Sequence, residues 1–335
     1  MSARACIIPV FVPHLGCPHA CVFCNQRHIT GEHGQVTAQS VRDAIQKAAA
    51  FTQNDVKRQL AFYGGSFTAI PEELQLELLG AAKEALDRGE IDSIRLSTRP
   101  DAIDEDVLDR LRRFGVKTIE LGAQSMSEEV LRLSKRGHSP DDVESASARI
   151  QAMGFELILQ MMTGLPGDTT ERSLETARRI IRIRPDGVRI YPTVLVRDSE
   201  LFDLWRSGLY REHTVEEAVS LCAKIVPLFQ QAGIPVIRIG LNPTEELSAG
   251  AAAGGAYHPA LGELVKSRIL LEKAKTLLAG SQPGASVKLG IAPQLLSQMI
   301  GQNGQNKQKL IEEFGLGSLK IIPLDETCLE PKIIL

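Results

Sequence analysis

The stretch Gly16-Cys17-Pro18-His19-Ala20-Cys21-Val22-Phe23-Cys24-Asn25 carries three cysteines at the spacing Cys-x3-Cys-x2-Cys. Thiolates that converge from one short loop are ligands for iron–sulfur clusters or zinc, because soft sulfur suits these metals. A closed structural zinc site needs four protein ligands, and a simple ferredoxin-type cluster needs four cysteines. Three local cysteines therefore predict a metal centre with one vertex left open for a ligand that is not a side chain.

A zinc site is the alternative for this stretch, and a nearby histidine would then complete the ligand set. The candidates are His14, His19 and His28. The remaining cysteines are scattered along the chain, and we interpret them as buried hydrophobic residues rather than ligands. They are Cys6, Cys222 and Cys328.

Strand-like and helix-like segments alternate on both sides of the cysteine stretch. The expected strands are Cys6–Val12, Leu60–Tyr63, Ser93–Ser97, Thr118–Gly122, Glu156–Met162 and Gly187–Tyr191, with Val236–Ile239 as one more candidate. The expected helices include one capped by Thr37 that runs to Phe51, and Asp104–Phe114, Thr170–Ile183 and Leu261–Leu278. Strands that alternate with helices of this length indicate βα units and a parallel sheet. We therefore expect an α/β fold, a partial (β/α)6 barrel of the TIM type.

The last part of the chain has a different pattern. Small residues from Ser248 to Ala256 mark a boundary or a loop, and we expect residues 1–245 to form the core barrel and residues 246–335 a small α/β extension. Within the extension, Gly301-Gln302-Asn303-Gly304 lies between two expected helices that are flanked by strands. This βααβ order is similar to the core of a KH module, which clamps single-stranded nucleic acid with a Gly-x-x-Gly loop. A generic βααβ cap gives the same pattern, and the loop carries Gln and Asn rather than Lys or Arg, so both interpretations stay open.

Composition bounds the class of protein. The chain has 335 residues, of which 43% are hydrophobic and 24% charged, and its net charge is −3. This is an ordinary globular composition without the global positive field that indicates nucleic-acid binding. We find no signal peptide and no apolar run of membrane-spanning length, so we expect a cytoplasmic protein that does not enter a membrane. The basic run from Arg178 to Arg184 is either a solvated outer face of the barrel or a stripe that follows phosphates.

Polar residues and glycines recur where the expected strands end. They are Gly64-Gly65-Ser66, Ser97-Thr98-Arg99, Gln124-Ser125, Gln160 with Gly164 to Gly167, and Arg189 with Tyr191. Functional residues of parallel βα barrels gather at the carboxyl ends of the strands. Glu120 lies inside the fourth strand, where it either takes part in function or pairs with a Lys or Arg of the barrel.

The three-cysteine loop after a first strand, with Phe23 before its last cysteine, resembles the radical S-adenosylmethionine (SAM) enzymes. More narrowly, the chain is similar to the radical-SAM portion of the Elongator catalytic subunit, and more loosely to oxygen-independent coproporphyrinogen oxidase. The matching stretches are Phe62–Thr68, Ser97–Asp101, Glu120–Ser125, Arg136–His138, Met161–Gly167 and Ile190–Trp205.

The resemblance implies a cofactor and a site. Cys17, Cys21 and Cys24 would bind three irons of a [4Fe–4S] cluster, and SAM would chelate the fourth. Reduction by a one-electron donor such as flavodoxin or ferredoxin would cleave SAM to a 5′-deoxyadenosyl radical. The implied SAM contacts are Gly64, Gly65, Ser97, Gln124, Arg136 and Gln160.

Two of these contacts depart from the relatives. Ser97 stands where they have a Glu, and Gln160 stands where the coproporphyrinogen type has an Asp. A hydroxyl or an amide can still bond a ribose, but without a charge.

The resemblance also ranks the functions. The first hypothesis is a radical SAM enzyme that acts on RNA or tRNA. No stretch resembles the acetyltransferase domain of the Elongator catalytic subunit, so we do not expect that family's complete reaction from this chain. The alternatives are a tetrapyrrole or other small-molecule reaction like that of the coproporphyrinogen relatives, and a non-catalytic cluster-bearing protein that binds haem or RNA.

Overall fold

The computed structural model describes residues 5–12, 17, 21–25, 36–51, 56–244 and 247–334. They form two compact units, one from Met1–Thr214 with Leu228–Pro259 and the other from Val215–Pro227 with Ala260–Leu335. The histidines considered for a zinc site, His14, His19 and His28, lie outside the described residues.

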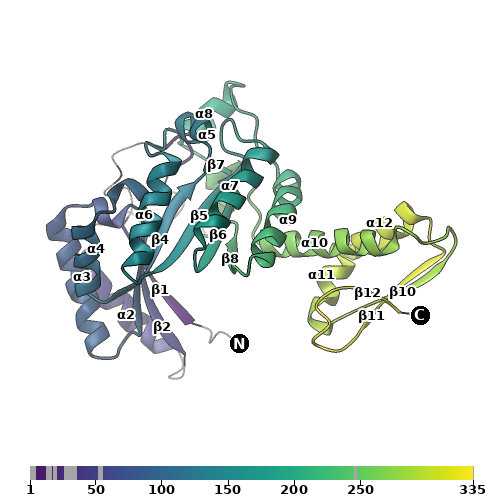
Figure 1. The fold of residues 1–335 in the computed structure, drawn as a ribbon, viewed down its shortest axis with the longest axis horizontal. Coiled ribbons are helices and arrows are strands. Elements are labelled where there is room, and N and C mark those ends of the chain that lie inside the picture. The colour runs from purple at the N-terminus through teal and green to yellow at the C-terminus, as the bar shows by residue number, and fades with distance from the viewer. Residues whose placement is uncertain are drawn as a thin grey trace. The chain divides into compact units, whose positions relative to one another are not determined.

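The first unit is built on a seven-stranded parallel sheet that curls into a partial barrel (Figure 1). Its strands are β1 (Ala5–Phe11), β2 (Lys57–Tyr63), β3 (Ser93–Thr98), β4 (Val116–Gln124), β5 (Glu156–Thr163), β6 (Gly187–Pro192) and β8 (Val236–Ile239). They pair in the order in which they occur in the sequence. The expected α/β partial barrel is confirmed, and the candidate strand at Val236–Ile239 is its seventh strand.

Helices connect the parallel strands and cover one face of the sheet (Figure 1). They are α2 (Ala38–Phe51), α3 (Glu72–Asp87), α4 (Glu105–Arg113), α6 (Pro140–Ala152) and α7 (Thr170–Ile183). Two shorter helices, α5 (Glu128–Leu133) and α8 (Glu200–Arg206), lie beyond the strand ends (Figure 1). Several begin at a side-chain cap that satisfies a free backbone N–H. The Asp104, Ser139 and Thr169 side chains accept hydrogen bonds from the first turns of α4, α6 and α7.

The two faces of the sheet differ in chemistry. Leu60, Leu96 and Leu159 point toward the helices and are completely buried. The alternate positions point to the inner face of the partial barrel and include Arg95 and Glu120. Because side chains alternate along a strand, an apolar outer face leaves the inner face free to carry polar chemistry.

A small two-stranded antiparallel sheet completes the first unit. It pairs β7 (Val194–Val196) with β9 (Ala252–Gly255). Helix α9 (Val215–Gln231) follows α8 in the chain and divides between the two units at Pro227.

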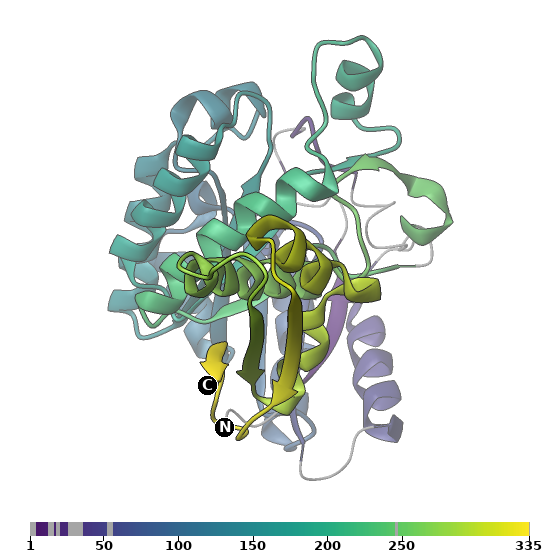
Figure 2. The same cartoon turned by 90° about the vertical axis from the view of Figure 1, so that its right-hand side faces the viewer.

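The second unit packs helices on a three-stranded sheet, whose strands lie side by side in Figure 2 with β10 in the middle. Its elements are α10 (Leu261–Leu278), β10 (Ser286–Ile291), α11 (Leu296–Ile300), α12 (Gln305–Phe314), β11 (Ser318–Pro323) and β12 (Lys332–Ile334). Strands β10 and β11 are parallel, and β12 is antiparallel to β10. Leu271, Leu289 and Leu310 lie in its buried core.

Three arginines of the basic run on α7 pair with glutamates. Arg178 and Arg182 pair with Glu175 on the same helix, and Arg179 pairs with Glu144 on α6. These pairs favour a solvated outer face over a stripe that follows phosphates.

None of the described helices is long and apolar enough to cross a membrane.

Candidate functional site

The cysteine loop is fixed to the barrel through Val22. This side chain is buried and packs against Leu195 of β7 and Leu201 of α8. The backbone N–H of Val22 donates to the Ser134 carbonyl at 3.2 Å, and the N–H of Leu201 donates to the Val22 carbonyl at 2.7 Å. The stretch between Cys21 and Cys24 is therefore held beside the segment that follows α5.

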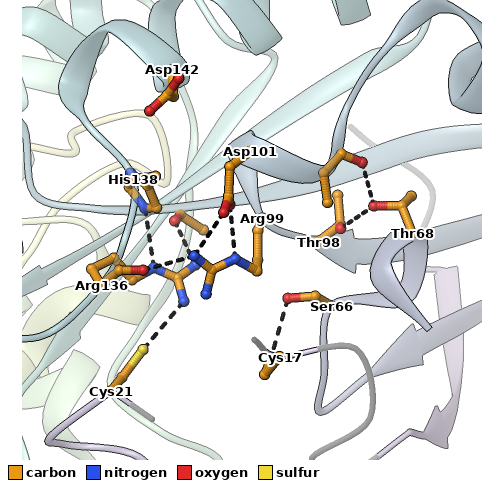
Figure 3. A network of polar contacts seen from close by, with 12 residues as sticks. Cys17, Cys21, Ser66, Thr68, Thr98, Arg99, Asp101, Arg136, His138 and Asp142 are labelled. Carbon is orange, nitrogen blue, oxygen red and sulfur yellow. Dashed lines mark hydrogen bonds and ion pairs between the residues drawn. The ribbon is translucent and has the colours of Figure 1, made fainter. Parts of the chain in front are cut away.

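Two of the cysteines contact residues outside their own loop, one after β2 and one after α5 (Figure 3). The Cys17 thiol lies 3.5 Å from the Ser66 hydroxyl, directly after the Gly64-Gly65 pair. The Cys21 sulfur accepts a hydrogen bond from Nη1 of Arg136 at 3.6 Å. The N–H of Cys24 donates to the Cys21 carbonyl at 3.0 Å, which places both residues in one turn.

The donor set fits an iron–sulfur cluster. Cys17, Cys21 and Cys24 are half-buried cysteines of one loop that form no disulfide, and such donors suit cluster iron. Within the described ranges, no three His, Cys, Asp or Glu side chains are gathered closely enough to hold a metal ion. Cluster binding therefore requires the three sulfurs to draw together from the positions seen here.

Arg136 is buried and its guanidinium is held from several sides. Its Nη2 donates to the Gly122 carbonyl at 2.9 Å, and its Nε donates to Nε2 of His138 at 3.1 Å. Its own carbonyl accepts a hydrogen bond from Arg99 at 2.7 Å, and Arg99 in turn forms a two-bonded ion pair with Asp101. These contacts fix both the position and the direction of the positive charge (Figure 3).

Three of the residues expected to contact SAM come together around Gly122. Gln124 has a left-handed backbone, with φ of 63°, after a register shift at the end of β4. The Gln160 amide of β5 donates to the Gln124 amide oxygen at 3.2 Å. Arg136 joins this group by donating a hydrogen bond to the Gly122 carbonyl. The sequence pointed to these side chains separately, and the structure joins them in one group.

The other expected contacts lie on neighbouring strands. Gly64 follows the last residue of β2 and has φ of 95°, a conformation that favours glycine. Gly65 separates it from Ser66, the contact of Cys17. Ser97 lies in β3 opposite Glu120 in the sheet register, and no hydrogen bond among the described residues joins it to the Gln124 group.

A buried charged cluster lies on the inner face of the barrel. Oε1 of Glu120 accepts hydrogen bonds from Arg95 at 2.6 Å, from Arg189 at 2.8 Å and from the Tyr63 hydroxyl at 3.0 Å. Arg189 also donates to the Tyr191 hydroxyl at 3.2 Å. Burial and the Glu120 carboxylate raise the pKa of Tyr63 above its ordinary value, so its hydroxyl stays protonated. The interpretation of Glu120 as the partner of a barrel Arg is confirmed, with two arginines rather than one.

A methyl group at Gly122 is expected to disrupt the Gln124 group without unfolding the protein. A Cβ there would lie 2.8 Å from both Nη2 of Arg136 and Nε2 of Gln124. Both are ends of long side chains, so they can move away. Moving the buried Arg136 guanidinium breaks its hydrogen bonds, so we expect Gly122→Ala to remain folded at a lower melting temperature and to weaken equilibrium binding of SAM. Gly80→Ala is the control, because Gly80 lies on α3 and a Cβ added there meets no atom within 4 Å. Gly154→Ala is not suitable, because the positive φ of Gly154 would strain an alanine. Equal SAM affinity in Gly122→Ala and wild type would contradict the prediction.

His138 is expected to make stability depend on pH. Burial, and then the charge of Arg136, lower the pKa of His138 from 6.5 to about 4. The unfolded chain therefore takes up this proton between pH 6.5 and 4 while the folded chain does not, so stability falls as the pH is lowered through that window. The contribution amounts to about 3 kcal/mol across the whole window. Urea unfolding of wild type and His138→Gln at a series of pH values tests this, since the variant should lose the extra slope. Parallel pH profiles would show that the His138 pKa is not lowered.

A parallel partial barrel with a three-cysteine loop beside the carboxyl ends of its strands belongs to the class of α/β barrels whose functional residues gather at that end. The family model of the radical SAM superfamily matches residues 11–180, and the model of the Radical_SAM C-terminal domain matches residues 185–270. The chain belongs to the radical SAM superfamily, and it is an enzyme.

Its relatives include Elongator complex protein 3 of Saccharomyces cerevisiae, 29% identical over 192 residues, which are 51% of this chain and 34% of that protein. The tRNA uridine(34) acetyltransferase of Methanocaldococcus infernus is 28% identical over 185 residues, which are 49% of this chain and 35% of that one. The match thus spans about a third of the length of these relatives.

Solved structures share the fold. The archaeal Methanocaldococcus infernus Elp3 superposes with a TM-score of 0.64 at 22% identity, over 82% of this chain and 64% of that one. HydG, a maturase of the [FeFe]-hydrogenase, has a TM-score of 0.53 at 15% identity, over 78% and 55% of the two chains.

Proposed function

We propose that the chain holds a [4Fe–4S] cluster on Cys17, Cys21 and Cys24, cleaves SAM reductively, and acts on RNA, with tRNA as the first candidate substrate. When bound, the cluster and SAM would supply a 5′-deoxyadenosyl radical after reduction by a donor such as flavodoxin or ferredoxin. The residues that would hold SAM are Gly64, Gly65, Ser97, Gln124, Arg136 and Gln160.

One observation carries the proposal: two thiols of the cysteine loop contact residues that adjoin the expected SAM residues. Cys17 meets Ser66 beside the glycine pair, and Cys21 meets Arg136 beside the Gln124 group. A metal centre on these thiols would therefore adjoin both groups.

The side chains of the site offer distinct contacts. Gly64 is half-buried, has a left-handed backbone and carries no Cβ, which suits close approach of a ligand to its backbone. Gln124 and Gln160 present amides that can bond hydroxyl or amino groups, and Ser97 presents a hydroxyl. Arg136 supplies the positive charge that a carboxylate needs.

The RNA substrate is supported by the relatives, one of which is named for a tRNA uridine.

In our proposed division, residues 1–245 carry the chemistry and residues 246–335 form the extension. Its Gly301–Gly304 loop joins α11 and α12, and a Cβ at Gly301 would lie 2.8 Å from Cγ of Asn306. A loop so constrained is suited to present its backbone to a partner, and we propose single-stranded RNA as that partner.

Anaerobic reconstitution with iron and sulfide, followed by dithionite and SAM, tests the chemistry. We expect 5′-deoxyadenosine to form, and to form faster with bulk tRNA than without it. An intact cluster that yields no 5′-deoxyadenosine would refute SAM cleavage. Failure to retain tRNA at low salt would refute the RNA substrate, and stimulation or retention by a tetrapyrrole would favour the small-molecule alternative.

A further inference from the structure

Among the residues that the structure describes, only neutral groups contact the buried, positively charged guanidinium of Arg136. Its nitrogens donate to the Gly122 carbonyl, to the His138 ring and to the Cys21 sulfur. The nearest acidic side chain in its network, Asp101, is engaged by both Nε and Nη2 of Arg99. In the described part of the chain, no carboxylate lies within ion-pair distance of Arg136.

A buried charge without a counter-charge is costly, because the interior does not replace the water that solvates it. The imidazole of His138 does not neutralise Arg136, since it accepts the Nε–H as an uncharged ring. The contact that can become negative is the sulfur of Cys21, which is a thiolate when it ligates a metal. The arrangement therefore has the charge that a thiolate-ligated cluster would complement.

The local backbone and Arg99 hold the Arg136 side chain in the direction of Cys21. Gly137 has φ of 81° and Lys135 has φ of 52°, so the backbone on both sides is in the left-handed region. Arg99 anchors the Arg136 carbonyl at 2.7 Å. The guanidinium is thus held facing Cys21 before any metal binds.

We propose that Arg136 is a positioning residue that raises the reduction potential of the cluster by holding its positive charge and an N–H donor against the Cys21 sulfur. This inference rests on the proposed function, because it requires a cluster on Cys21. Reduction adds one negative charge to the cluster, and a fixed positive charge at hydrogen-bond distance stabilises the reduced form more than the oxidised form. Hydrogen bonds to ligand sulfurs shift the potential in the same direction.

The test is a potentiometric titration of the reconstituted full-length protein, followed by electron paramagnetic resonance and run without SAM. Leaving SAM out removes any effect of Arg136 on SAM binding. In Arg136→Gln we expect a more negative midpoint, with the ratio of reduced to oxidised cluster at a fixed potential lowered about tenfold, which is 59 mV for a one-electron couple. Arg132→Gln is the matched control, because it removes the same charge from an exposed position of α5 and should leave the midpoint unchanged.

The outcomes distinguish the proposed function from the proposed role of Arg136. If the wild type takes up no cluster, the proposed function fails. If Arg136→Gln binds the same amount of iron and keeps the wild-type midpoint, the proposed function stands and this inference is wrong. Should Arg136→Gln take up no iron, Arg136→Lys decides by the same titration. Lysine keeps a positive charge but lacks the planar guanidinium fork that fixes the charge against Cys21, so the midpoint of this variant should also become more negative, and an unchanged midpoint would overturn the inference.

Discussion

Replacing Cys21 with alanine is expected to remove the iron–sulfur cluster and all 5′-deoxyadenosine formation with it. With three cysteines in the loop, loss of one leaves two thiolates, too few to retain a cluster that already lacks a fourth protein ligand. Arg136 would also lose the sulfur that accepts its Nη1–H. After anaerobic reconstitution, iron content, visible absorbance and 5′-deoxyadenosine should all fall to background.

The substitution should spare the fold. Cys21 is half-buried, whereas the anchor of its loop is the neighbouring Val22, whose packing and backbone hydrogen bonds do not involve the thiol. Far-ultraviolet circular dichroism should therefore match wild type. Cys328→Ala is the control, because Cys328 lies in the second unit and should leave the iron content unchanged. A Cys21→Ala protein that keeps its cluster would place the metal centre on other ligands.

Local patterns predicted the elements of the fold because they depend on residues close together in the sequence. Thr37 was expected to cap a helix, and its hydroxyl accepts the Ser40 N–H at 3.2 Å at the start of α2. The expected helices Thr170–Ile183 and Leu261–Leu278 agree with α7 and α10 to the residue. Capping and periodicity are local properties, so a single sequence carries them.

The partners inside the site could not be predicted in this way, because they depend on how strands are staggered. Alternation along β4 places Glu120 on the inner face, but it does not say that Arg95 and Arg189 meet there. The hydrogen bond between Gln124 and Gln160 depends on the register shift that turns Gln124 into the left-handed region. Alternation along a strand determines on which face of the sheet a side chain lies, whereas the register between strands determines which side chain lies next to it.

Replacing Glu120 with alanine is expected to cause the largest loss of stability among these substitutions. The Glu120 side chain is 3% exposed, and it is the carboxylate that pairs with Arg95 and Arg189, which are 12% and 9% exposed. A guanidinium group is not deprotonated in proteins, so the variant would bury two positive charges without an acidic partner. Breaking a buried pair in this way costs about 3–5 kcal/mol. Urea denaturation should show that loss as a lower unfolding midpoint.

Glu175 provides a matched control, because it also pairs with two arginines but on the outer surface of α7. Its side chain is 51% exposed, and its partners Arg178 and Arg182 are 54% and 63% exposed. Water solvates all three charges after Glu175→Ala, so we expect a loss of less than about 1 kcal/mol. Similar losses in Glu120→Ala and Glu175→Ala would mean that the inner face of the barrel solvates its arginines as well as the outer surface does. A loss confined to Glu120→Ala would instead show that the carboxylate holds β3, β4 and β6 together by neutralising charge that the barrel has taken out of water.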